Sequence, residues 1–137
     1  MSYLIFISHS SEDTWVAEKL SNECKAAGAD IFLDRANIAF GTDIDASIFQ
    51  ALGIANELVV LITPWALERL YIWTEIGVAL YRKIPIIVLL HGVSPDKFQG
   101  NPSVPWSLKQ KRLLTLNEAD QYIEALTARV SGNGGAL

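Results

Sequence analysis

The stretch LYIWTEIGVALY, residues 70–81, is apolar almost throughout and carries a single carboxylate, that of Glu75. A carboxylate beside this much apolar surface must be solvated, paired with a cation or used in chemistry. In chemistry it would stabilise a positive charge, because an apolar wall lowers the local dielectric constant and strengthens the attraction. On helical spacing alone, two simpler interpretations stay open: a solvated residue on a helix edge, or a partner of Arg69 or Arg82.

Further polar and aromatic side chains follow the first three apolar runs of the sequence. They are Ser8, His9 and Ser10 after the first run, Arg35 after the second, and Thr63 and Trp65 after the third. Some of them have structural explanations. Ser10 with Asp13 forms a helix capping-box pattern, and an aromatic residue such as Trp65 at a helical position is usually part of a core.

Hydrophobic periodicity predicts alternating strands and helices. Continuous apolar runs predict strands at 3–8, 29–34, 57–63, 84–91 and, more briefly, 111–116. Helical spacing of apolar residues predicts helices over about 11–27, over 43–56, over 64–82 with a break near 68–70, and after Asn117. Asn117 with Asp120 is expected to cap the last helix, and residues 92–110 to form an irregular loop with one short helical turn.

This order of elements predicts a flavodoxin-like, doubly wound, five-stranded parallel sheet, order 2-1-3-4-5, with helices on both faces. We expect one domain over residues 1–130, and a flexible tail or a linker to an absent domain over residues 131–137. Such sheets bind ligands beyond the carboxyl ends of their strands, between strands 1 and 3. Glu75, on the helix after the third strand, can lean toward that crevice.

Composition argues against several classes of protein. The chain of 137 residues has a net charge of −4 and no dense Lys/Arg run, so we expect no direct nucleic-acid binding. The single cysteine, Cys24, allows no internal disulfide and fits a reducing compartment. The N-terminus lacks a signal-peptide pattern, and the strongest apolar run, residues 84–93, is about half of a bilayer span. We expect a cytoplasmic protein without membrane contact.

Familiar catalytic motifs are missing from the sequence. The third strand ends in Thr63, where a response-regulator receiver needs its phosphoacceptor aspartate. There is no G-x-G-x-x-G, no P-loop lysine and no G-x-S-x-G elbow. His9, His91 and Cys24 lack metal-ligand spacing, so we expect no metal site.

Three segments in order nevertheless resemble a known family. They are FISHSSED at the first strand, GADIFLDRANIAFG through the second strand and its loop, and the helix glutamate Glu75. Together, over roughly residues 3–116, they resemble a bacterial Toll/interleukin-1 receptor (TIR) domain. Many such domains are homotypic assembly modules, and many bacterial members also split NAD+ into nicotinamide and a linear or cyclised ADP-ribose product.

The resemblance implies roles for several residues. In the enzymatic members an essential glutamate follows an aromatic residue, usually Trp, by four positions; here Glu75 matches it and Tyr71 replaces the Trp. The expected substrate-binding residues, with NAD+ as substrate and no separate cofactor, are Ser8, His9, Ser10, Arg35, Phe40, Trp65 and Tyr71. The loop 35–41, apolar at its tip, would join subunits or cover the nicotinamide.

One glutamate is sufficient for this reaction. Most glycosidic cleavage needs a second carboxyl group to protonate the leaving group. Nicotinamide is bonded to the ribose of NAD+ as a cation and departs neutral, so that proton is not needed. The remaining ribose is cationic, and a carboxylate in the position of Glu75 can stabilise it or orient its hydroxyls.

The sequence leaves three functions open. The first is an NAD+-cleaving enzyme activated by self-assembly, which the resemblance associates with bacterial defence against phage and with a second domain or partner protein. The second is a non-enzymatic adaptor that binds other TIR domains through the loop 35–41. The third, from fold analogy alone, is a nucleoside deoxyribosyltransferase-like enzyme that uses a glutamate nucleophile.

Overall fold

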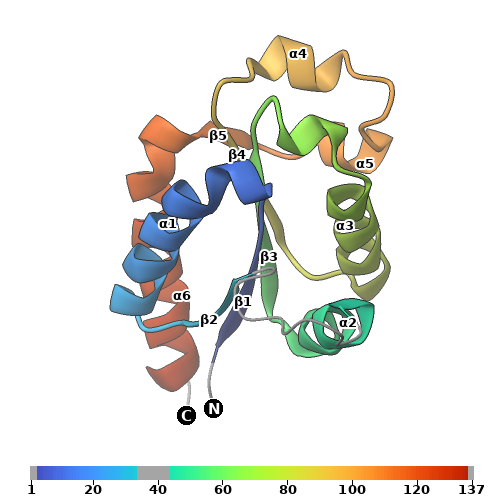
Figure 1. Ribbon diagram of the computed structural model, residues 1–137. Helices are drawn as coiled ribbons and strands as arrows, with labels where there is room; N and C mark the ends of the chain where they lie inside the picture. Colours follow the sequence, from blue (N-terminus) through green and yellow to red (C-terminus); the bar gives the residue numbers. More distant parts are fainter. Residues whose placement is uncertain (1–2, 34–43, 136–137) are drawn as a thin grey trace.

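The computed structural model describes residues 3–33 and 44–135 (Figure 1). The strands are β1 (Leu4–Ser8), β2 (Asp30–Leu33), β3 (Glu57–Ile62), β4 (Ile86–Leu90) and β5 (Leu113–Thr115). The α-helices are α1 (Thr14–Ala26), α2 (Ile44–Ile54), α3 (Leu70–Arg82), α4 (Pro95–Gln99), α5 (Trp106–Lys109) and α6 (Ala119–Gly135). Short 3₁₀ helices are η1 (Ser11–Asp13), η2 (Ala66–Glu68) and η3 (Leu116–Glu118).

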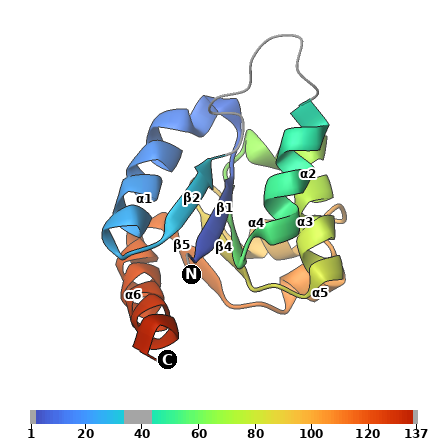
Figure 2. The same ribbon diagram turned by 90° about the horizontal axis from the view of Figure 1, so that it is seen from below.

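The five strands form one parallel sheet in the order β2-β1-β3-β4-β5, which confirms the predicted doubly wound fold. Helices α1 and α6 cover one face of the sheet, and α2 and α3 cover the other (Figures 1 and 2). An apolar core lies on each side. All six residues of β3 are buried, because this central strand is covered on both faces. Among the described residues, no helix is both long and apolar enough to cross a membrane.

Alternation along the central strands decides which helices each side chain meets. On β1, Phe6 packs into the core under α2 and α3, whereas Ile5 and Ile7 pack into the core under α1 and α6. Because successive side chains point to opposite faces, Ser8 at the end of β1 points toward α3. On β3 the same rule turns the side chain of Glu57 toward α6.

The helix that carries Glu75 begins where the sequence predicted a break. After β3 the chain forms η2, and Arg69 then takes an extended conformation, with φ −99° and ψ 112°, before α3 starts at Leu70. The inward face of α3 buries Ile72, Ile76 and Ala79 against the sheet, and it buries Glu75 with them.

Several local expectations were wrong. The reciprocal capping box of Thr115 and Glu118 caps η3, which precedes α6, and Asn117, the expected cap of the last helix, lies inside η3. The segment 92–110 contains two short helices, α4 and α5, instead of one helical turn. Helix α6 continues to Gly135, so part of the segment expected as a flexible tail is helical.

Candidate functional site

Glu75 and Ser8 meet at the carboxyl end of β1. The Ser8 hydroxyl donates to Oε1 of Glu75 at 2.5 Å, and the two side chains are 0% and 2% exposed, Ser8 being the fully buried one. The solvated interpretation of Glu75 is therefore wrong. A hydrogen bond to a carboxylate in a buried setting fixes its rotamer and is stronger than one between neutral groups. The structure brings together two of the residues that the sequence singled out.

Neither arginine suggested as a partner of Glu75 is placed for that role. Arg82 Nη1 donates to the carbonyl oxygens of Leu52 at 2.6 Å and Ala55 at 2.7 Å, at the end of α2. Arg69 Nη2 lies 3.6 Å from Oε1 of Glu12 on η1. Each guanidinium thus has a partner other than Glu75, and the interpretation of Glu75 as a partner of either one loses its support.

Tyr71 lies one helical turn before Glu75 on the same side of α3. Its hydroxyl donates to the backbone carbonyl oxygen of His9 at 3.0 Å, which ties α3 to the segment after β1 a second time. The His9 side chain is 3% exposed. Tyr71 and His9, both expected at the site, therefore lie beside the Ser8–Glu75 pair.

A second buried hydrogen-bonded pair, Asp13 and Thr63, lies at the same edge of the sheet, and the sequence did not indicate this pair as part of the site. The hydroxyl of Thr63, directly after β3, donates to Oδ2 of Asp13 at 2.6 Å and accepts from the backbone N–H of Ala66 at 3.1 Å. The sequence indicated a capping box for Asp13 and placed Thr63 at the end of the third strand, without pairing the two. Ser10 does cap η1, with Oγ accepting from the backbone N–H of Glu12 at 3.3 Å, but the Asp13 carboxylate bonds Thr63 rather than completing a capping box.

The remaining expected substrate-binding residues have different outcomes. Trp65 is 51% exposed, so it is not the core residue that its helical position suggested. Arg35, Phe40 and the rest of the loop 35–41 lie outside the described residues. Their expected roles stay predictions.

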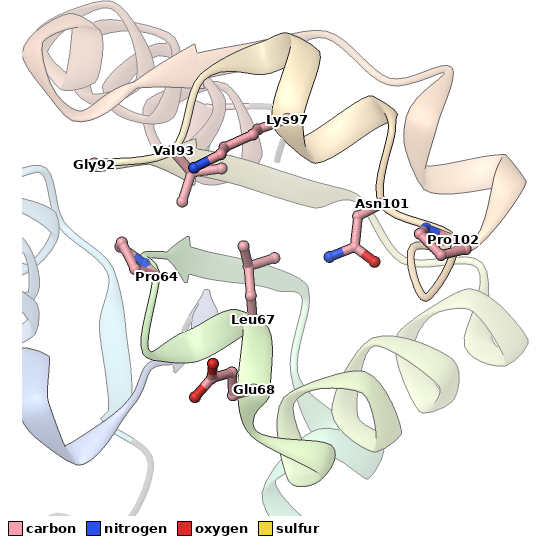
Figure 3. A pocket seen from close by; sticks show the side chains of 8 residues that line it. All are labelled: Pro64, Leu67, Glu68, Gly92, Val93, Lys97, Asn101 and Pro102. Carbon is pink, nitrogen blue, oxygen red and sulfur yellow. The ribbon is translucent and has the colours of Figure 1, made fainter.

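A cavity of about 500 Å³ opens at the carboxyl ends of β3 and β4. Leu67 and Glu68 line it from the connection after β3, while Lys97 and Asn101 point into it from the opposite wall (Figure 3). Gly92, at φ +76°, borders the cavity, and a Cβ on it would lie 3.3 Å from Pro64 Cδ, so glycine permits the two connections to approach. Neither Ser8 nor Glu75 lines this cavity.

Three solved structures illustrate the likeness in fold. The TIR domain of the Toll-related receptor TRR-2 from Hydra magnipapillata is 20% identical, with a TM-score of 0.63 and 91% of each chain covered. A TIR-STING receptor from C. gigas is 18% identical, with a TM-score of 0.68, covering 89% of this chain and 39% of that one. A 2-desoxiribosyltransferase from Leishmania mexicana is 12% identical, with a TM-score of 0.68, covering 89% of this chain and 97% of that one.

At these identities the structures show a shared fold and no more. Comparison with curated proteins found no match. The sequence model of the family described as TIR domain matches residues 5–127, which is nearly the whole chain. On that match, this chain belongs to the TIR domain family.

Proposed function

We propose that this TIR domain cleaves the bond between nicotinamide and ribose in NAD+, with Glu75 acting on the ribose. The supporting observation is the Glu75 carboxylate, buried at 2% exposure and 2.5 Å from the Ser8 hydroxyl. It lies at the carboxyl edge of the sheet between β1 and β3, where doubly wound folds bind ligands. The choice of NAD+ comes from the resemblance to NAD+-cleaving TIR domains.

The reaction balances without a second acid. The C–N bond between ribose C1′ and nicotinamide breaks, and its electron pair stays on the ring nitrogen, which makes nicotinamide neutral. The ribose becomes cationic, and the Glu75 carboxylate stabilises it. Water then adds to C1′ and releases a proton, which gives ADP-ribose, or a nucleophile on the adenine adds instead and gives a cyclic product.

Neighbouring residues would position these groups. Ser8 holds one oxygen of Glu75 and is a positioning residue, and Tyr71 keeps α3 at a fixed distance from the segment after β1 through its bond to the His9 carbonyl oxygen. His9 and Ser10, at the same strand end, are proposed to bind the ribose or the diphosphate. We propose Arg35 for phosphate contact, Phe40 for covering the nicotinamide, and Trp65 for stacking on a base.

Access to Glu75 links activity to a conformational change. A carboxylate that is 2% exposed must become accessible before it can contact a ribose. We therefore propose that self-association, through the loop 35–41 and under the control of a second domain or partner protein, opens and completes the site. On the resemblance to bacterial TIR domains, we propose that this activity serves bacterial defence signalling.

The decisive experiment is nicotinamide release from NAD+ by the concentrated protein, measured beside Glu75→Gln and Glu124→Gln. Glu75→Gln keeps the shape and a hydrogen-bonding partner for Ser8 but removes the charge, so release should stop. Glu124 is exposed on α6, and its variant should match the wild type. Equal release by all three proteins would remove Glu75 from the mechanism.

Two rival functions predict different results in the same assay. One rival is a deoxyribosyltransferase-like enzyme, because the Leishmania mexicana protein has a similar fold. Such an enzyme would release bases from deoxynucleosides and leave NAD+ intact. A non-enzymatic adaptor would release nothing from either substrate, even when crowding forces the chains together. Nicotinamide release from NAD+, without base release from deoxynucleosides, supports the proposal.

A further inference from the structure

The cavity at the carboxyl ends of β3 and β4 has the size of a small-molecule site. Its volume of about 500 Å³ lies within the range that such sites have in proteins. Two connections form its walls, the one that follows β3 and the one that follows β4 (Figure 3). Because neither Ser8 nor Glu75 lines it, the proposed cleavage of NAD+ does not explain this cavity.

The wall that follows β4 is held in place from inside the molecule. Ser94 caps α4, with Oγ accepting from the backbone N–H of Lys97 at 3.1 Å. Phe98, on the same helix, is 0% exposed and packs into the core. The backbone that carries Lys97 and Asn101 is therefore anchored, and both side chains are directed into the cavity (Figure 3).

The Asn101 side chain is oriented by a neighbouring backbone group. Its Oδ1 accepts from the backbone N–H of Ser103 at 2.8 Å. The side-chain NH2 group consequently faces the cavity, on the side of Leu67 (Figure 3). Together with the Lys97 ammonium, it gives this wall two hydrogen-bond donors, one of them charged. Such a pair of donors suits an anionic oxygen.

The opposite wall carries the complementary charge, on Glu68. Within the part of the chain that the structure describes, neither Glu68 nor Lys97 forms an ion pair, although both line the same cavity. Both residues are exposed. The two opposite charges thus face one cavity without neutralising each other, and a bound molecule with two charges of its own can bridge them.

The rest of the cavity surface is mainly apolar. Pro64 and Leu67 contribute to it on one wall, and Val93 and Pro102 on the other. Apolar walls with a few polar groups that fix the orientation of the ligand are typical of small-molecule sites. A ligand for this cavity therefore needs an apolar part as well as two charged ends.

The charges select the class of ligand. One cation and one anion line the cavity, so a complementary ligand carries one charge of each sign. A nucleotide is a poorer match, because its phosphate brings about two negative charges to a single lysine and also meets the Glu68 carboxylate. An amino acid has a carboxylate for Lys97 and Asn101, an ammonium group for Glu68 and a side chain for the apolar walls.

We propose that this cavity binds a free apolar L-amino acid, with its carboxylate held by Lys97 and Asn101 and its ammonium group held by Glu68. The proposal does not rest on NAD+ cleavage, because it uses none of the residues around Glu75.

Titration of the full chain with L-leucine tests the site, followed by calorimetry and by NMR of the backbone amides. The amides that shift should be those around the cavity, led by Glu68, Gly92 and Lys97, with a Kd that is roughly millimolar or tighter. The thermal midpoint should rise with the concentration of L-leucine, because only the folded chain has the cavity. L-alanine should bind about tenfold more weakly, since it buries less apolar surface.

Two analogues of L-leucine each remove one charge. L-leucinamide lacks the carboxylate and N-acetyl-L-leucine lacks the ammonium group, and each should bind about fivefold more weakly than L-leucine. Lys97→Gln should weaken the binding of L-leucine by a similar factor but hardly change that of L-leucinamide, because both changes remove the same ion pair. Glu68→Gln should act in the same way toward N-acetyl-L-leucine.

Asn101→Asp tests the amide donor. The new side chain can still accept from the Ser103 N–H, but its charge repels the ligand carboxylate, so L-leucine should bind about tenfold more weakly. Lys25→Gln and Glu124→Gln are the matched controls. Both residues are exposed, on α1 and α6, and neither lines the cavity, so the affinity for L-leucine should not change.

Three outcomes would overturn the proposal. The first is no binding of L-leucine, L-methionine or L-phenylalanine at millimolar concentration. The second is binding of L-leucine that Lys97→Gln and Glu68→Gln leave unchanged. The third is binding of adenosine monophosphate without binding of any of these amino acids, which would make the cavity a nucleotide site. Failure of the NAD+ assay would not affect these results, because Glu75 does not line the cavity.

Discussion

Oγ of Ser8 lies 2.5 Å from Oε1 of Glu75, although 67 positions separate the two residues in the chain. The bond joins the end of β1 to the middle of α3, across the point where the strand order reverses. It fixes the direction of a carboxylate that lies on an otherwise apolar helix face. Ser8 and Glu75 together are the starting point for the first prediction.

Ser8→Ala should lower kcat for nicotinamide release by about tenfold to a hundredfold, because a hydrogen bond to a charged group contributes about 1.5–3 kcal/mol. KM should change little, since Ser8 acts through the orientation of Glu75. Steady-state kinetics on NAD+ checks this, with Ser103→Ala, an exposed serine, as the control. An unchanged kcat in Ser8→Ala would show that Glu75 needs no positioning from Ser8.

Thr63→Val should lower the free energy of unfolding by about 1–3 kcal/mol, because it leaves the buried Asp13 carboxylate without the hydroxyl at 2.6 Å. Urea unfolding measures the change. Thr127→Val is the comparison, since the exposed Thr127 hydroxyl bonds the Ile123 carbonyl oxygen of its own helix and should matter little. Equal effects of the two substitutions would contradict a special role for the Asp13–Thr63 pair.

A buried carboxylate at the opposite end of β3 anchors α6 to the sheet. Glu57 is 0% exposed and accepts from the hydroxyls of Tyr3, at 2.6 Å, and Tyr122, and from Nη2 of Arg129 at 3.0 Å. Tyr3 shares the Glu57 side of the sheet, and Tyr122 and Arg129 come from α6. The network therefore lies at the amino edge of the sheet, away from the Ser8–Glu75 pair.

Arg129→Met should lower the free energy of unfolding by about 2–4 kcal/mol, because it removes the cation from a fully buried carboxylate. The partial exposure of the Arg129 side chain, 39%, keeps the effect below that of a fully buried pair. Urea unfolding of Arg112→Met gives the comparison, because the Arg112 guanidinium donates to the Gln121 side chain at the surface. Nicotinamide release per folded molecule should not change, and a large loss of activity would show that the network reaches the site.

Alkaline pH should destabilise the protein through Cys24. Burial, followed by the charges of Glu57 and Glu23, raises the pKa of the Cys24 thiol from 9.0 to about 12. The unfolded chain then loses this proton at lower pH than the folded chain, so the stabilisation is complete below pH 9.0 and is lost as the pH rises toward 12. The expected fall is roughly 1 kcal/mol for the first pH unit above the unfolded pKa.

Urea titrations below and above pH 9.0 measure this fall, and Cys24→Ala should make it smaller. Burial and the neighbouring Glu57 also raise the pKa of Tyr3 and Tyr122 above 10.0, so a further fall at higher pH should remain in Cys24→Ala. An identical pH dependence in wild type and Cys24→Ala would contradict the assignment to the thiol.

Sequence by itself determined the fold and singled out Glu75, whose role at the site stays a prediction. The apolar runs at β1, β3 and β4 and the helical stripes between them specify a parallel sheet covered on both sides, because alternating strands and helices have few other ways to bury their apolar faces. Glu75 stood out because a lone charge in an apolar helix must have a reason. The break before α3 was also readable from the sequence.

Only the tertiary structure decided which polar groups pair. The sequence showed Ser8, Asp13, Glu57 and Thr63 at strand and helix ends. It assigned no partner to Glu57 or Thr63, and only a capping box to Asp13. Side chains along a strand alternate between faces. A shift of one residue in the register of a strand would therefore turn each of its side chains to the opposite face of the sheet, away from its partner. Because those boundaries are fixed by packing against the helices, the partners of these residues were decided by the assembled fold and not by local sequence.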